Sequence, residues 1–253
     1  MNGLKQQIRD FICTTAKELD AEEAGGIWRP ALVGFADAEN AEFTKLREIV
    51  HPLHAVPTES LPGARTVVSY FLPFTPELGK TNAGGTLSSE EWAAAYVRTN
   101  RCIRIINDAA VAFLQERGFA AMVPPEAYTF DEERIKSCWS QRHIARICGL
   151  GTFGLNNMLI SEVGSCGRYA SFLTSAVIEP DPIITEDRCL FRREGLCGVC
   201  ADKCITGALS RESFDRVTCF EACHVNGRQY GYMGETEVCG KCVVDNPCSF
   251  CCP

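Results

Sequence analysis

The sequence predicts an α+β domain over residues 1–180, followed by a cysteine-rich domain over residues 181–253. Helix-like and strand-like segments mix along the first part without a regular βαβ repeat, which favours α+β over a doubly wound sheet. The composition changes at Glu179-Pro180-Asp181-Pro182, and 11 of the 16 cysteines follow from Cys189 onward. At 253 residues the chain is long enough for one large or two modest domains.

The first elements follow from apolar spacing. Residues 2–22 have helical periodicity and stop at Gly25-Gly26, while residues 31–37 form a short apolar run that suits a buried strand. A polar segment follows. Residues 61–74 contain a turn signal and then a β-branched and aromatic run, which predicts a second strand.

The middle of the chain is predicted from capping and turn signals. Residues 75–86 are predicted as a loop, and Ser88 with Glu91 forms a capping box before a long helix that stops at Gly118. The remaining predicted elements, in chain order, are a strand with a proline-marked turn at 119–130, a helix at 131–147, a glycine-rich turn at 149–161 and a strand at 169–179.

Charge and hydropathy exclude some classes of function. The net charge of −7 and the isoelectric point near 5.2 argue against non-specific nucleic-acid binding, which needs clustered basic charge. No apolar run reaches the length of a membrane span, and the first residues have no signal-peptide core. We therefore expect a cytoplasmic, reducing location, which suits thiolate metal ligands better than disulfides.

The cysteines are spaced as iron–sulfur ligands. The bacterial two-cluster run is C-x2-C-x2-C-x3-C-P, in which the last cysteine binds the other cluster. Glu194 and Ile205 replace the first cysteine and the proline of one run, and Asp245 replaces the third cysteine of a second run. Earlier or later cysteines can supply the missing thiolates. The eight cysteines that result, enough for two [4Fe–4S] clusters, are Cys189, Cys197, Cys200, Cys204, Cys219, Cys239, Cys242 and Cys248.

Two other interpretations of these cysteines are weaker. A disulfide framework suits a small secreted domain, and this chain is neither small nor marked for secretion. Zinc could use two CxxC pairs, Cys197 with Cys200 and Cys239 with Cys242. A zinc site of that kind would leave the other four cysteines unexplained, so two [4Fe–4S] clusters remain the favoured prediction.

The stretch Gly149-Leu-Gly-Thr-Phe-Gly154 matches G-x-G-x-x-G, which alone is a weak signal for a dinucleotide site. The residues before it are predicted to be helical, and Glu162 comes too early for the acidic partner of that fingerprint. A helix C-cap at Gly149 and a tight turn is the simpler interpretation. The other is close approach of the backbone to a planar cofactor, contacted by Gly149, Gly151, Gly154, Asn156 and Asn157.

The stretches WSQRHIARICGLGTFGLNNMLI and CLFRREGLCGVCADKCITGAL resemble epoxyqueuosine reductase and its relatives, cobalamin-dependent iron–sulfur proteins related to the reductive dehalogenases. The similarity runs from about Leu61 onward. It implies a nitroreductase-like N-terminal α/β sandwich domain, a base-off cobalamin above it, and a ferredoxin-like domain with two [4Fe–4S] clusters. Carried over by position, one cluster takes Cys189, Cys197, Cys200 and Cys248, and the other takes Cys204, Cys219, Cys239 and Cys242.

The chain departs from that family at the general acid. The family's D-x-x-P-x-x-E-R stretch is matched here by Ile135, Cys138, Gln141 and Arg142, so only the arginine is kept. No match to the helical-repeat tail that helps hold tRNA is found, and nucleic acid is not an expected partner. Asp131 and His143 are the candidate catalytic residues. A solvent-exposed first turn of a helix for Asp131, and a half-buried structural histidine for His143, are the simpler interpretations.

The other cysteines and histidines have simpler explanations. Cys138, Cys148 and Cys166 flank the predicted pocket and are more often core residues than redox partners. The roles of Cys223, Cys251 and Cys252 stay open. His51 and His54 share a proline-rich loop, and two histidines do not make a metal site.

The favoured function is a redox protein that passes electrons through two [4Fe–4S] clusters to a cofactor or substrate in the N-terminal domain. Cobalamin and another acceptor both stay open, and a non-catalytic ferredoxin-type carrier is the alternative. The expected partners are a low-potential donor of ferredoxin or flavodoxin type and a small-molecule or cofactor acceptor, with no membrane. Because exposed clusters are oxygen-labile, this chemistry suits an anaerobe.

Overall fold

A computed structural model describes residues 2–253. Its centre is a four-stranded antiparallel sheet in the order β1-β2-β8-β3. The strands span Leu32–Asp37 (β1), Thr66–Pro73 (β2), Gly167–Thr174 (β8) and Ala121–Met122 (β3). Val68 pairs with both Phe35 and Phe172, which fixes the register of the three long strands. Every residue of β2 is buried, because both faces of the sheet are covered.

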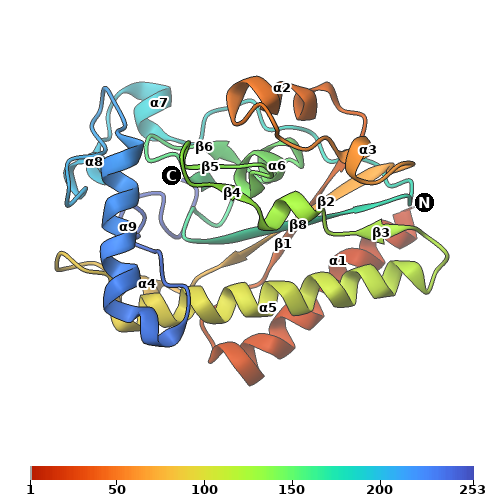
Figure 1. Ribbon diagram of the computed structural model, residues 1–253, viewed down its shortest axis with the longest axis horizontal. Coiled ribbons are helices and arrows are strands. Elements are labelled where there is room, and N and C mark those ends of the chain that lie inside the picture. Colours follow the sequence, from red (N-terminus) through yellow and green to blue (C-terminus); the bar gives the residue numbers. More distant parts are fainter. Residues whose placement is uncertain (1) are drawn as a thin grey trace.

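Helices cover the two faces of the sheet (Figure 1). On one face lie α1 (Asn2–Leu19), continued by a π-helical turn at Asp20–Ala24, and the long α5 (Glu90–Gln115). On the other lie α6 (Gln141–Ile147), which packs on β2 and β8, and α2 (Ala41–Ile49), which packs on α6. The α+β prediction and its layered arrangement are therefore correct in outline.

Shorter elements join this frame. They are α3 (Pro57–Ser60), α4 (Pro76–Thr81), a 3-10 turn at Pro125–Tyr128, the hairpin β4–β5 (Phe130–Asp131 and Lys136–Ser137) and the hairpin β6–β7 (Thr152–Phe153 and Leu159–Ile160). In the cysteine-rich part follow α7 (Leu190–Glu194), α8 (Val199–Asp202), α9 (Arg216–Tyr230) and a 3-10 turn at Gly231–Met233.

Three local predictions were wrong. The helix predicted over residues 131–147 is only α6, because residues 130–137 form the β4–β5 hairpin, with Ile135 at a positive φ of 52°. The cap of α5 is Ser89, whose Oγ accepts the Trp92 N–H, one residue after the predicted Ser88. The predicted loop at 75–86 contains α4, capped by Thr75. The polar segment after β1, for which no element was predicted, contains α2 and α3.

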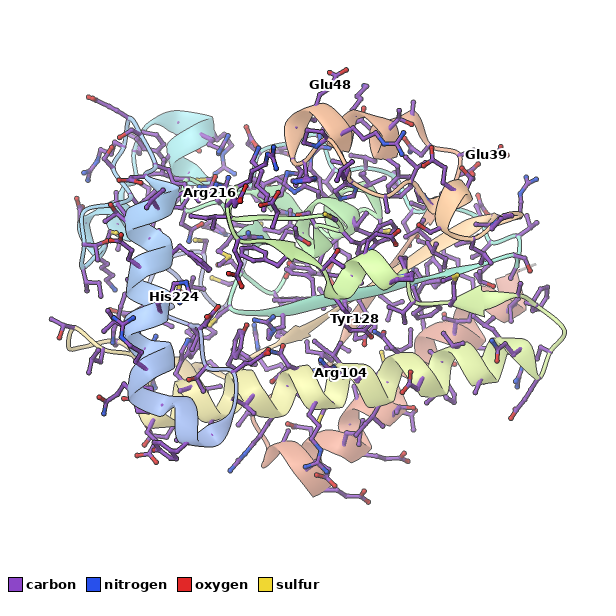
Figure 2. All side chains as sticks on the ribbon, in the orientation of Figure 1. Glu39, Glu48, Arg104, Tyr128, Arg216 and His224 are labelled. Carbon is purple, nitrogen blue, oxygen red and sulfur yellow. The ribbon has the colours of Figure 1, made fainter. Side chains whose placement is uncertain are left out.

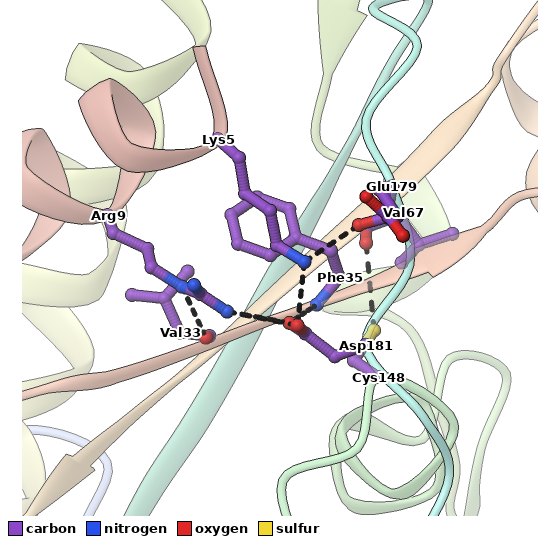
Figure 3. A network of polar contacts seen from close by, with 8 residues as sticks. All are labelled: Lys5, Arg9, Val33, Phe35, Val67, Cys148, Glu179 and Asp181. Atoms are coloured by element: carbon purple, nitrogen blue, oxygen red, sulfur yellow. Dashed lines mark hydrogen bonds and ion pairs between the residues drawn. The ribbon is translucent and has the colours of Figure 1, made fainter. Parts of the chain in front are cut away.

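The segment at the predicted domain boundary is attached to the first helix and strand (Figure 3). The Asp181 carboxylate accepts hydrogen bonds from Lys5 Nζ at 2.7 Å, from Arg9 Nη2 at 2.9 Å and from the Phe35 N–H at 3.1 Å. Lys5 also donates to the Glu179 carbonyl. A boundary between residues 180 and 181 therefore remains a prediction, with these contacts crossing it.

The end of the cysteine-rich part returns to the core of the first part. Val243 and Val244 are buried in the same cluster as Phe35 and Phe172. The Cys166 N–H donates to the Ser249 carbonyl at 3.0 Å, so the last residues lie against β8. In the described residues 2–253, no helix combines the length and apolar character that crossing a bilayer requires.

Candidate iron–sulfur site

The cysteines form two groups that mix distant parts of the sequence. A recess is lined by Cys189, Cys197, Cys200 and Cys248, which we name group A. The Gly154-Leu155-Asn156 backbone and the loop at Asn246-Pro247 complete its walls. Cys248 thus joins three thiols that precede it by about fifty residues, as the resemblance to epoxyqueuosine reductases implied.

Burial and the proximity of neighbouring thiols raise the pKa of two group A cysteines. Burial raises the pKa of Cys200 to about 11, with a further contribution from Cys189 and Cys197. Burial likewise raises the pKa of Cys248 to about 11, and Cys200 and Cys189 add to the shift while the Ser165 hydroxyl opposes it. Because burial keeps the Cys200 and Cys248 thiols protonated, binding of a metal must displace their protons.

Group B is defined as Cys204, Cys219, Cys239 and Cys242. Burial raises the pKa of Cys242 well above its usual value, and Cys239, Cys219, Cys200 and Cys204 add to that rise. The inclusion of Cys200 means that group A lies next to group B. Asn156 connects them, since it lines the group A recess and its Nδ2 donates to the Cys242 carbonyl at 2.8 Å.

Cys204 differs from the other group B thiols. Burial alone would raise its pKa, but hydrogen bonds from the Leu209 N–H and around Thr206 outweigh burial and lower it. The Leu209 N–H donates directly to Cys204 Sγ at 3.3 Å. Backbone donors of this kind stabilise a thiolate and tune the potential of a cluster that it binds.

The loop that carries Cys239 and Cys242 is held by buried polar contacts. Lys241 is 4% exposed, and its Nζ donates to the Asn82 carbonyl at 3.1 Å. Asn82 Nδ2 donates in turn to the Cys239 carbonyl at 2.9 Å. These contacts fix the CxxC pair against the loop after α4, so group B is positioned by the first part of the chain.

Arg142 is a cationic residue of α6 that precedes the glycine loop. It is half-buried, and its guanidinium donates to the Asn157 carbonyl at 2.9 Å. Burial lowers its pKa, and the nearby Arg216 and Arg168 lower it further, while Cys242 and Cys219 oppose the shift. Arg142 has no carboxylate within ion-pair distance in residues 2–253. Its charge therefore faces the group B thiols.

The β4–β5 hairpin borders group B from another side. Arg216, at the start of α9, points toward this hairpin in Figure 2 and donates to the Ile135 carbonyl at 3.2 Å. Phe130 packs on Phe220 with ring centroids 5.5 Å apart. Cys219, which follows Thr218 on α9, is thereby brought near the hairpin that replaces the predicted helix.

The glycine loop is a helix C-cap followed by the β6–β7 hairpin. Gly149, at φ 76°, follows α6, and the Leu150 N–H donates to the Ala145 carbonyl at 3.0 Å. A Cβ at Gly149 would lie 2.6 Å from the Pro182 carbonyl oxygen, and one at Gly151 would lie 2.2 Å from that of Ile160. These two glycines make room for the chain's own backbone. The structure thus supports the C-cap interpretation over a dinucleotide fingerprint.

The other loop residues predicted to bind a cofactor divide in their roles. Gly154 and Asn156 line the group A recess together with its four thiols. Asn157 has a positive φ of 58°, and its N–H donates to the Gly154 carbonyl, which is the arrangement of a turn residue. The side chain of Asn157 has no contact that assigns it a ligand.

The two candidate catalytic residues have different partners. Asp131 accepts hydrogen bonds from the Arg134 N–H, from His51 and from the Arg134 guanidinium, which together hold its pKa well below the usual range. An ionised carboxylate of this kind accepts a proton but does not supply one. His143 contacts Ser140 Oγ at 2.8 Å, and burial and Arg142 lower its pKa to about 4.

The remaining cysteines lie outside the two groups. Cys148 and Cys166 are fully buried in the core, as their simpler interpretation predicted. Cys223 is half-buried beside group B, and burial raises its pKa to about 12, with added contributions from Cys219 and Cys239. Cys251 and Cys252 are exposed.

A mononuclear metal site is not formed in the described part of the chain. No three His, Cys, Asp or Glu side chains in residues 2–253 converge closely enough to hold one metal ion. In a [4Fe–4S] cluster each thiolate binds a different iron, so the four sulfurs stand farther apart than the ligands of a zinc ion.

The fold and these two groups define an α+β protein with a cysteine-rich C-terminal part. Among solved structures, it has the fold of the epoxyqueuosine reductases. A selenomethionine-labelled epoxyqueuosine reductase aligns with 94% of this chain and 66% of its own length, at 19% identity and a TM-score of 0.59. The enzyme from Bacillus subtilis aligns with 94% of this chain and 66% of its own length, at 19% identity and a TM-score of 0.58. The enzyme from Streptococcus thermophilus aligns with 98% of this chain and 66% of its own length, at 19% identity and a TM-score of 0.53.

The chain spans slightly less than two thirds of the length of these enzymes. No protein-family profile matches the chain. No curated protein matches it in sequence. At 19% identity the likeness establishes the fold, and the chemistry has to be argued from the residues of this chain.

Proposed function

We propose that this chain is an iron–sulfur redox protein that binds one [4Fe–4S] cluster at group A and a second at group B. The observation that carries the proposal is the arrangement of eight thiols in two adjacent groups of four, with Cys204 and Cys248 exchanged between the two cysteine runs. That exchange is the pattern of two-cluster ferredoxins. Thiolate-bound clusters need reducing surroundings, so the proposal includes a cytoplasmic location.

The chain's own residues have distinct tasks in this proposal. When bound, the clusters supply one-electron storage. The eight thiolates hold them, the Leu209 N–H stabilises Cys204 Sγ, and Arg142 places positive charge beside Cys219 and Cys242. Electrons enter from a low-potential donor of ferredoxin or flavodoxin type and leave to an acceptor bound by the N-terminal part. The contact of Asn156 with both groups keeps the two clusters adjacent.

The residues fit the clusters better than they fit a corrinoid. Carbonyl oxygens of Pro182 and Ile160 fill the space next to Gly149 and Gly151, where the backbone was predicted to approach a planar cofactor. We therefore propose no role for cobalamin in this chain. The acidic net charge of −7 opposes non-specific binding of a polyanion, so the proposal does not include the tRNA stem loop seen bound to one epoxyqueuosine reductase.

Because carbonyl oxygens occupy the space beside Gly149 and Gly151, one alternative is favoured. It is a ferredoxin-type electron carrier in which the N-terminal part is a docking surface. Both versions need the same clusters and differ in whether the chain turns over a substrate. A donor-dependent reduction of a small molecule by the purified chain supports the enzyme. Electron exchange only with a partner protein supports the carrier.

The proposal predicts two interacting paramagnets on reduction. Anaerobic titration with dithionite should take up about two electrons per chain and give an EPR spectrum broadened by coupling between two neighbouring reduced clusters. The coupling is expected because groups A and B lie next to each other. Two uncoupled signals, or one electron per chain in a preparation with full iron content, would contradict the adjacent arrangement.

A further inference from the structure

A cysteine, a histidine and a carboxylate lie in line outside the two cysteine groups. Cys138 Sγ is 3.8 Å from His51 Nδ1, and His51 Nε2 is 3.0 Å from Asp131 Oδ2. The three residues come from separate segments: His51 follows α2, Asp131 ends β4 and Cys138 follows β5. None of them has a role in the cluster proposal.

The hydrogen bonds fix the tautomer of the imidazole. The Leu53 N–H donates to His51 Nδ1 at 3.0 Å, so Nδ1 carries the lone pair and Nε2 carries the proton. The Nε2–H then donates to Asp131, whose carboxylate is kept ionised by Arg134. This is the tautomer that a base facing a thiol requires. The Leu53 N–H occupies the one lone pair of Nδ1, so it must turn away before the thiol, 3.8 Å from Nδ1, can donate its proton.

The thiol is held on a rigid backbone yet stays accessible. The Ala55 N–H donates to the Cys138 carbonyl at 2.9 Å, and the next residue, Trp139, is only 1% exposed, with its Nε1–H donating to Ser171 Oγ. His51 is 2% exposed, whereas Cys138 is partly exposed. The base is therefore shielded from water, while part of Cys138 is open to solvent.

We propose that Cys138 is a nucleophilic thiol, with His51 as its base and Asp131 positioning the imidazole. The order of atoms, nucleophile to ring nitrogen and second ring nitrogen to a third group, is that of activated cysteine sites. The substrate class is a disulfide. Attack on a disulfide moves negative charge from one sulfur to another, so it needs a thiolate and access but no dedicated donors for an oxyanion.

The thiol–disulfide exchange at Cys138 needs no added reductant or oxidant. Once the Leu53 N–H has turned away, the Cys138 S–H proton passes to His51 Nδ1 as Sγ forms a bond to one sulfur of the disulfide. The sulfur–sulfur bond of the substrate breaks, and the departing thiolate takes the proton from the imidazolium. The products are a mixed disulfide on Cys138 and one free thiol. The exchange does not depend on the clusters, so it stands apart from the proposed function.

The test uses the full chain, purified anaerobically with its metal content, and dithiodipyridine as the disulfide at pH 7. Samples are quenched with N-ethylmaleimide, and mass spectrometry follows each thiol. Trypsin releases Cys138 alone in the peptide SCWSQR. Exposed Cys252 is the internal reference. We expect Cys138 to react about tenfold faster than Cys252 despite its lower exposure, because base assistance contributes at least that much in enzymes.

Variants separate activation from simple exposure. His51→Gln should slow Cys138 about tenfold, toward the rate of Cys252. His224→Gln, at a half-exposed histidine on α9, should leave the Cys138 rate unchanged. Asp131→Ala should slow Cys138, and Asp131→Glu should restore part of the rate, which a purely structural role would not. Equal rates for Cys138 and Cys252 in the unaltered chain, or a fast Cys138 in folded His51→Gln, overturn the proposal.

The readouts remain decisive if one variant fails to fold. His51 is buried, so His51→Gln is judged only with an unchanged circular dichroism spectrum, and the ratio of Cys138 to Cys252 in the unaltered chain needs no variant. Iron and sulfide are measured on the same sample. A reactive Cys138 in a chain without clusters upholds this inference and refutes the cluster proposal. An unreactive Cys138 in a chain with both clusters refutes this inference and upholds the cluster proposal.

Discussion

Serine in place of Cys200 should remove one cluster and leave the other, so that iron falls from about eight to about four per chain. Cys200 is one of four thiols around the group A recess, and a hydroxyl is a much poorer iron ligand than a thiolate. Iron and acid-labile sulfide, assayed after anaerobic purification, measure the loss. Cys251→Ser is the matched control: Cys251 is exposed, lies three residues from a predicted ligand and should keep all the iron.

The same substitution at other ligands tests how the thiols are grouped. Cys248→Ser should remove the same EPR signal as Cys200→Ser, although 48 residues separate them. Cys204→Ser, only four residues from Cys200, should remove the signal that Cys219→Ser removes. Grouping by sequence proximity, with Cys204 paired to Cys200, would contradict the exchange of Cys204 and Cys248 between the runs.

Methionine in place of Arg142 should lower the reduction potential of the group B cluster by several tens of millivolts. The reduced cluster carries one more negative charge than the oxidised one, so a nearby guanidinium favours reduction and its removal opposes it. Arg142 lies near Cys242 and Cys219 without a carboxylate partner in residues 2–253. EPR-monitored redox titration measures the shift, and the group A potential should move less.

Two further variants make the Arg142 result interpretable. Arg142→Lys keeps the charge and should hold the potential close to that of the unaltered chain. Arg117→Met removes an exposed arginine that stacks on Phe113 beyond the end of α5, and it should change nothing. A group B potential that rises, or that shifts equally in Arg142→Met and Arg142→Lys, would show that the charge of Arg142 is not what acts on the cluster.

The sequence predicts those elements whose apolar residues have a clear period. Helix α1, the strands β1, β2 and β8, and most of α5 fall where periodicity predicts them. Helix α9 has no such signal, because its apolar residues do not gather on one face and only Asn226 among its residues is buried. Ser88 looks like a cap locally, yet it binds Asn226 Oδ1, a contact 138 residues away that no local pattern shows.

In the candidate site, too, the sequence predicts some features, and others depend on contacts that only the fold creates. Cysteine spacing identifies the eight thiols because ligand spacing is local in each run. The sequence could not predict that the space beside the glycine loop is filled, because the carbonyl groups of Pro182 and Ile160 that fill it are brought there by the fold. The pairing of Cys138 with His51 was missed for a related reason. Asp131 and Cys138 were predicted on one helix, whereas the β4–β5 hairpin places both against the loop after α2.

The most direct test of the central claim is the iron, acid-labile sulfide, zinc and cobalt content of anaerobically purified chain. We predict about eight irons and about eight sulfides per chain, as two [4Fe–4S] clusters require. Cobalt in addition would place a corrinoid in the N-terminal part, against the fit of the glycine loop. Near-stoichiometric zinc without sulfide, reproduced after anaerobic reconstitution with iron and sulfide, would contradict the account and leave a zinc-structured binding module.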